Sequence, residues 1–215
     1  HKEKEYILDK IPKIYRQFIE HQMLDISKHP MEVAPTAHYS MGGIKVEASD
    51  HQTSVKGLFA AGEVAGGLHG ANRLGGNSLA EILVFGKQAG HAASIYSKNL
   101  TSHIRSLKVI NTSHENINRF IKKGNQLAIP LQNELRDLMW KYCGVVKNEA
   151  SLKIGLDQIR KLKKLLKNID VRITDGNYKD LINTLELEAS IYTAEATLKS
   201  SLERDESIGA HQRND

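Results

Sequence analysis

Apolar positions change their spacing twice along the chain, which divides it into three stretches. The first apolar residues follow a three- and four-residue spacing, which predicts a helix over residues 5–22 with a break at Pro12. From Met31 to Glu47, β-branched residues, a proline and a glycine pair indicate short extended segments joined by turns. "SVKGLFAAGEV", residues 54–64, then predicts a short apolar strand that ends at Gly62.

A glycine-rich loop follows and runs into a long apolar segment. "SLAEILVFGKQAGHAASIY" predicts a helix from Ser78 to about Tyr96. Either Asn77 or Ser78 suits its N-cap, and Glu81 stands three residues beyond Ser78, as a capping box requires.

The pattern from about residue 105 onward is helical throughout. One helix surrounds Ile117, and Pro130 is expected to be the first residue of the next. A third helix carries apolar residues at helical spacing from Leu152 to Ile169. The last, over residues 181–202, carries two apolar stripes and is therefore expected to pack on both sides at the centre of a bundle. The fold class is α+β, with predicted divisions at 1–32, 33–104 and 105–215.

Composition is that of an ordinary globular protein, with 215 residues, 40% hydrophobic and 26% charged. Cys143 is the only cysteine, which excludes an internal disulfide and fits a reducing compartment. No apolar run approaches the roughly 20 residues that span a bilayer, so no direct membrane insertion is expected. The chain begins with neither a methionine nor a leader sequence, and we expect it to be a piece of a longer protein.

The net charge of +5 has its densest patch in "RKLKKLLK", residues 160–167. Because leucines separate these lysines at helical spacing, the solvated face of an amphipathic helix explains the patch better than a nucleic-acid site. A non-catalytic, basic helical binding module is still kept as an alternative from a different functional class.

The glycine-rich loop carries the clearest candidate chemistry. A loop that runs into a helix N-terminus concentrates unpaired N–H groups and the positive end of the helix dipole. Gly75 and Gly76 let a ligand approach the backbone closely, while Arg73 offers a planar fork for a carboxylate or phosphate. An anion site and an ordinary surface loop both fit this stretch. Its spacing is neither a P-loop nor a dinucleotide fingerprint, and no metal site is predicted.

Two further residues come into question. His38 lies between a proline and a glycine pair, where a single histidine is more often structural than catalytic. Glu63 directly follows the predicted strand and a glycine, and the carboxyl end of a strand in a doubly wound sheet faces the ligand crevice. Ribose binding by Glu63 is the resulting hypothesis.

Four motifs together resemble a known family. "APTAHYSMGGI", "GLFAAGEV", "GLHGANRLGGNSLAEILVFG" and "ESIGAHQRND" occur in this order in the flavoprotein subunits of succinate dehydrogenase and fumarate reductase. The resemblance covers essentially the whole chain, and "HGANRLGGNSLAE" is its most specific element. L-aspartate oxidase is a related alternative, although that branch tends to have cysteine at the position of Met41 and "NRMASNSL" in the loop.

The resemblance implies roles for the candidate residues. Arg73 would grip one carboxylate of the dicarboxylate substrate, His38 would hold the other end, and Glu63 would bind FAD. Asn77, Ser78 and Leu79 would set the helix N-terminus against the flavin, where its positive end stabilises the charge of the reduced ring. The implied reaction interconverts succinate and fumarate by hydride transfer at flavin N5.

The resemblance also implies what surrounds the chain. Residues 33–104 would be the C-terminal part of a Rossmann-like FAD-binding domain, after the end of a capping domain and before an all-α bundle. The dinucleotide fingerprint, the histidine that links FAD and the proton-shuttling arginine would lie upstream, so the chain alone is expected to be inactive. Implied partners are an iron–sulfur subunit, with membrane anchor subunits bound through it, which gives a cytoplasmic or peripheral location on the cytoplasmic face.

Two residues depart from the family pattern. The late motif usually reads "ESRGAH", but Ile208 replaces its arginine here, and Lys147 stands where arginine is common. The resemblance implies that the first change would affect a contact to the iron–sulfur partner or to the rest of the flavoprotein, and we expect it to leave the substrate loop untouched.

Overall fold

The computed structural model describes residues 3–33, 38–102, 106–174 and 176–215, which form two compact units. The first unit, His1–His38, contains helices α1 (Lys4–Lys10) and α2 (Pro12–Gln22). Pro12 is the first residue of α2, where its missing N–H costs nothing, and this confirms the predicted break. The second unit, Tyr39–Asp215, contains all other elements. The three predicted domain divisions stay predictions.

The predicted strand over residues 54–64 is wrong. This part of the second unit holds single bridges instead, which pair Val46 with Thr53, Gln52 with Phe59 and Ile44 with Ala65. Gly57 and Gly62, both with φ of +83°, turn the backbone out of the extended conformation before a ladder can form.

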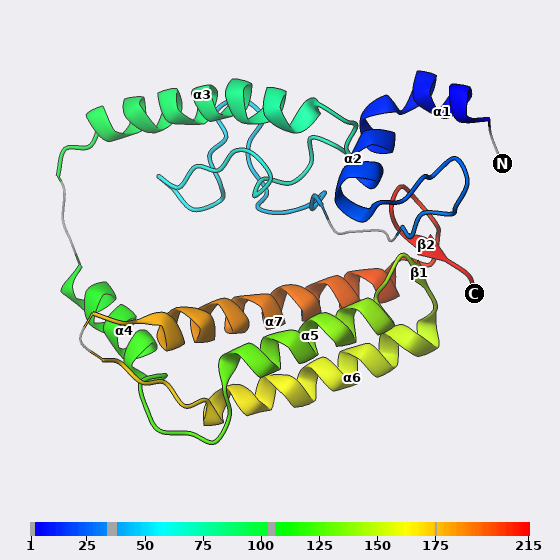
Figure 1. The fold of residues 1–215 in the computed structure, drawn as a ribbon. Coiled ribbons are helices and arrows are strands. Elements are labelled where there is room, and N and C mark those ends of the chain that lie inside the picture. Colours follow the sequence, from blue (N-terminus) through cyan, green and yellow to red (C-terminus); the bar gives the residue numbers. More distant parts are fainter. Residues whose placement is uncertain (1–2, 34–37, 103–105, 175) are drawn as a thin grey trace. The chain divides into compact units, whose positions relative to one another are not determined.

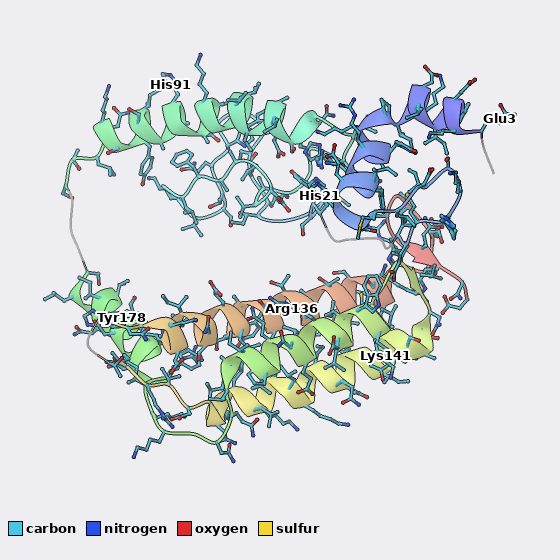
Figure 2. All side chains as sticks on the ribbon, viewed as in Figure 1. Glu3, His21, His91, Arg136, Lys141 and Tyr178 are labelled. Atoms are coloured by element: carbon cyan, nitrogen blue, oxygen red, sulfur yellow. The ribbon has the colours of Figure 1, made fainter. Side chains whose placement is uncertain are left out.

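Helix α3 (Asn77–Lys98) packs against these bridged turns. The amide of Gln88 donates to the carbonyls of Ala48 and Ser49, and the rings of His51 and Phe85 lie 4.7 Å apart. Most of α3 is exposed, including His91 (Figure 2), and its described buried residues are Glu81 and Ala89.

The rest of the second unit is helical. Helices α4 (Leu107–Asn118), α5 (Ala128–Tyr142), α6 (Glu149–Leu165) and α7 (Lys179–Glu203) follow in order, with the short 3₁₀ helix η1 (Leu166–Asn168) after α6. Figure 1 shows α5, α6 and α7 side by side. Two short strands, β1 (Val146–Lys147) and β2 (Gln212–Arg213), pair in parallel.

The three-helix core confirms most of the apolar pattern. Helix α7 packs on both α5 and α6, as its two stripes predict. The largest fully buried side chains are Leu152, Ile159, Leu162, Ile169, Thr184, Leu187, Ile191 and Leu198. Helix α5 begins at Ala128, so the expectation that Pro130 is its first residue is wrong by two positions, although Pro130 still lies in the first turn.

The basic stretch 160–167 belongs to this core. Leu162 and Leu166 are buried, and Lys163 donates to Glu195 of α7 at 2.7 Å. Lys161 and Lys164 are exposed and line the outer face of this packed amphipathic helix, while Lys163 lies at its border with α7. In the part of the chain that the structure describes, no helix has the length and apolar character needed to cross a membrane.

Glu195 is a buried carboxylate that joins α6 to α7. It lies 2.7 Å from Lys163 and 2.8 Å from Lys199. These two hydrogen bonds lower the pKa of Glu195 from 4.5 to about 2. A carboxylate whose folded pKa is depressed stabilises the fold above its unfolded pKa and loses that contribution as the pH falls.

We predict that Glu195→Gln lowers the free energy of unfolding by about 2 kcal/mol at pH 7. The loss should shrink between pH 4.5 and about 2, where wild-type Glu195 itself becomes protonated. Urea denaturation at several pH values measures it. Glu149→Gln, which breaks an exposed pair with Lys153, is the control and should cost less than about 0.5 kcal/mol. An equal loss in both variants would contradict the role of burial.

Candidate active site

The N-terminus of α3 is open to a ligand. Its N-cap is Gly76, with φ of +84°, and this residue offers no side-chain acceptor to the first-turn amides. No atom lies within 4 Å of the positions that side chains would occupy at Gly75 and Gly76. The helix therefore presents N–H groups and its positive dipole end at a point where backbone and ligand can meet.

The predicted capping box is wrong. Asn77 is already helical, so neither it nor Ser78 is the N-cap. Glu81 lies a full turn inside the helix, and its carboxylate binds other partners. A serine followed three residues later by a glutamate is found both in a capping box and where the glutamate is buried early in a helix. The local sequence therefore does not distinguish the two.

Glu81 is the centre of a buried polar cluster. Its Oε2 accepts from the Tyr39 hydroxyl at 2.6 Å and lies 2.9 Å from His69 Nε2. Because a carboxylate only accepts, His69 Nε2 carries the proton of the second hydrogen bond. The Glu81 and His69 side chains are only 3% and 9% exposed, so this pairing is made away from water.

The contacts within the cluster shift the pKa values of both Glu81 and Tyr39. Burial raises the pKa of Glu81, but the hydrogen bonds from Tyr39 and His69 outweigh burial and bring that pKa below its usual value. The hydrogen bond to Glu81 raises the pKa of Tyr39 to about 12. Glu81 is therefore ionised and Tyr39 is a hydrogen-bond donor at neutral pH.

Arg73 lies on the Tyr39 ring. Its guanidinium carbon is 4.5 Å from the ring centroid, and its Nη1 donates to the carbonyl of Leu74 at 3.0 Å. Its Nε is buried and has no hydrogen-bond partner among the described residues. An unpaired buried donor on a charged group costs free energy, so its presence indicates a site for an acceptor from outside the described chain.

Glu63 lies close to the same cluster. Its Oε1 accepts from the backbone N–H of Ser40 at 2.9 Å, and the side chain is exposed. Its charge also contributes to the raised pKa of Tyr39. Of the residues that the sequence singles out, the structure thus brings Arg73 and Glu63 close to Tyr39 and Ser40.

For the other candidate residues, the described part of the chain gives a location and an exposure but no side-chain hydrogen bond to the cluster around Glu81. Asn77, Ser78 and Leu79 form the first turn of α3, where Ser78 is half-buried and the other two are exposed. His38 is exposed and is the last residue of the first unit. Residues 34–37, which open the first family motif, lie outside the described residues. The assigned roles of all these residues stay predictions.

Comparisons with known proteins agree with the motifs. A model of the FAD-binding domain matches residues 1–79, and a model of the fumarate reductase flavoprotein C-terminus matches residues 132–215. A fumarate reductase (CoM/CoB) subunit from Methanothermobacter marburgensis is 40% identical over 98% of this chain. The fumarate reductase flavoprotein subunit of Haemophilus influenzae is 35% identical over all of it.

A solved structure extends the agreement to the fold. Mycobacterium smegmatis Sdh1, in complex with UQ1, matches 99% of this chain with a TM-score of 0.88 and 34% identity. The chain belongs to the succinate dehydrogenase and fumarate reductase flavoprotein family. It spans 38% and 37% of the two curated relatives and 36% of the solved chain.

FAD is the cofactor of this flavoprotein family, and the residues present fit it. The open α3 N-terminus suits an anionic or electron-rich group, and the exposed Glu63 carboxylate suits hydroxyl donors. The sequence did not single out Tyr39 or His69, and it placed Glu81 in a capping box and not in a buried polar cluster. Tyr39 stands directly after His38 and His69 four residues before Arg73, so proximity to the motif residues was the available signal.

The C-terminal family motif packs on the glycine-rich loop. Gly209, with φ of +58°, packs so closely on Ala71 that a side chain there would collide with the Ala71 carbonyl. A groove of about 460 Å³ runs beside this contact, and its walls include Lys147 and Ile208. Both departures from the family pattern thus line one groove beside the loop that carries Arg73.

We predict that Gly209→Ala loosens the loop over residues 67–76. The added methyl group meets backbone, and the positive φ adds strain, so a loss of stability of about 1–3 kcal/mol is expected. Thermal unfolding and limited proteolysis within the loop measure the two effects. Gly90→Ala, on α3 with open space around it, is the control and should leave stability equal or higher. Unchanged loop protection in Gly209→Ala would show that this contact does not support the loop.

Proposed function

We propose that this chain is part of an FAD-dependent oxidoreductase that interconverts succinate and fumarate. The observation that carries the proposal is the buried, unpartnered Nε of Arg73 beside the open N-terminus of α3. A dicarboxylate accepting from this guanidinium would satisfy that donor and neutralise the cluster's cation. The relatives named as fumarate reductase subunits support this substrate class.

Each candidate residue has a defined task in this proposal. Arg73 binds and orients one substrate carboxylate, and His38 holds the other, so that the central C–C bond is fixed. Glu63 accepts hydroxyl groups of the cofactor. The first turn of α3, with Asn77, Ser78 and Leu79, lies against the flavin and stabilises negative charge there. Bound FAD supplies a two-electron centre that takes up or returns a hydride.

The family relationship also supports the partners. We propose that the full flavoprotein passes electrons to an iron–sulfur subunit, which connects it to membrane anchors on the cytoplasmic face. The solved relatives include a quinol–fumarate reductase with menaquinol molecules and the complex of Sdh1 with UQ1. Met41 and the glycine pair at 75–76 favour this branch over L-aspartate oxidase. The alternative of a basic helical binding module is not favoured, because the leucines between the lysines of residues 160–167 pack into the bundle core.

We predict that Arg73→Lys in the full-length, FAD-loaded subunit lowers kcat/KM for succinate and fumarate at least about 100-fold. A lysine offers a point charge, while the guanidinium offers a planar fork that sits on Tyr39. Dye-coupled turnover with succinate, fumarate and L-aspartate measures the effect. Arg136→Lys, an exposed site on α5 (Figure 2), is the control and should stay within about twofold of wild type. Wild-type rates in Arg73→Lys, or turnover of L-aspartate alone, would contradict the proposal.

A further inference from the structure

The proposed chemistry makes no use of Glu81, although burying its carboxylate costs free energy of desolvation. A buried carboxylate loses its hydration, and only paired donors compensate it. Helix α3 has two buried residues among those described, and one of them is this acid, 4% exposed, while apolar residues such as Leu79 and Leu83 of the same helix are exposed. An apolar residue would fill this inward position without the desolvation cost. The position therefore calls for a role beyond packing.

The cluster holds the Tyr39 ring from three directions. The hydroxyl is tied to Glu81 at 2.6 Å, and the ring meets His69 edge to face, with centroids 5.4 Å apart and an angle of 80° between planes. The carbon of the Arg73 guanidinium lies 4.5 Å from the centroid of the same ring. Because the hydroxyl is tied to Glu81, the Tyr39 side chain cannot move away from this position without breaking a hydrogen bond to a buried carboxylate.

The carboxylate also strengthens the contact between Tyr39 and Arg73. A phenol that donates to an ionised acceptor becomes more electron-rich, and an electron-rich ring attracts a cation more strongly. The link from Glu81 through Tyr39 to Arg73 thus acts electrostatically as well as sterically. His69 shares the same carboxylate oxygen and holds it in place.

We propose that Glu81, with Tyr39 and His69, forms a positioning unit that fixes the plane of the Arg73 guanidinium, so that its unpartnered Nε–H faces a carboxylate of the substrate. The inference rests on the proposed function. It assigns Glu81 as a positioning residue, because its side chain acts through Tyr39 and Arg73 and is not placed in contact with substrate. A substrate then binds to a guanidinium whose orientation is already fixed.

The test measures binding of malonate to the full-length, FAD-loaded subunit. Malonate is a dicarboxylate that cannot be desaturated, because a single carbon separates its carboxylates. Its dissociation constant is read from the change in flavin absorbance on titration. The variants are Glu81→Gln, which keeps shape and removes charge, Tyr39→Phe, which keeps the ring and removes the hydroxyl, and Tyr39→Leu, which removes the ring. Glu195→Gln is the matched control, since it makes the same change at a buried, paired carboxylate in the bundle.

We expect Glu81→Gln and Tyr39→Leu to raise the dissociation constant about tenfold, and Tyr39→Phe about threefold, because the ring still carries Arg73. Glu195→Gln should bind malonate as wild type does. In an Arg73→Gln background, Glu81→Gln should change the dissociation constant by less than about twofold, since the group through which it acts is gone. A role in stability alone would not produce this coupling.

The outcomes separate the two proposals. If wild type binds malonate and Glu81→Gln and Tyr39→Phe bind it equally well, the positioning role is wrong and the proposed function stands. If Glu81→Gln weakens binding equally with and without Arg73, Glu81 does not act through Arg73, and the inference is also overturned. If wild type binds neither malonate nor succinate, the proposed function fails and the positioning role fails with it. Because Tyr39→Phe preserves the packed ring, the test does not depend on Glu81→Gln being well folded.

Discussion

A buried carboxylate that has to be paired organises the candidate site. Glu81 is held away from water, and the pairing it needs fixes Tyr39 and His69, which lie 30 residues apart in the chain. Tyr39 in turn carries Arg73, whose buried Nε has no partner among the described residues. The need to pair the buried Glu81 carboxylate therefore positions Arg73 through Tyr39. The Nε–H of Arg73 is left for a ligand.

The helical part supports this arrangement mechanically. The bundle of α5, α6 and α7 is packed around fully buried aliphatic side chains, and its last helix leads into the segment that ends with β2. Gly209 of that segment packs directly on Ala71, two residues before Arg73. This contact holds the glycine-rich loop in place on the helical part.

The sequence predicts those elements that depend on regular burial. Helix α7 has two apolar stripes because it contacts two neighbours, and Pro12 begins a helix because its ring tolerates that position. The strand at 54–64 could not be predicted correctly, since apolar content does not reveal that Gly57 and Gly62 turn the chain. Arg73 could be singled out from its motif, but the role of Glu81 depends on Tyr39, 42 residues away in the chain. Such a contact leaves no local pattern.

The most direct test is a crystal structure of the full-length, FAD-loaded subunit with a bound dicarboxylate, in which the distance from Arg73 Nε to the nearest ligand oxygen is measured. The account predicts a hydrogen bond of about 2.9 Å, with the guanidinium still over the Tyr39 ring and Tyr39 still bonded to Glu81. A ligand bound elsewhere, or an Arg73 side chain that leaves the Tyr39 ring to reach it, would contradict the account.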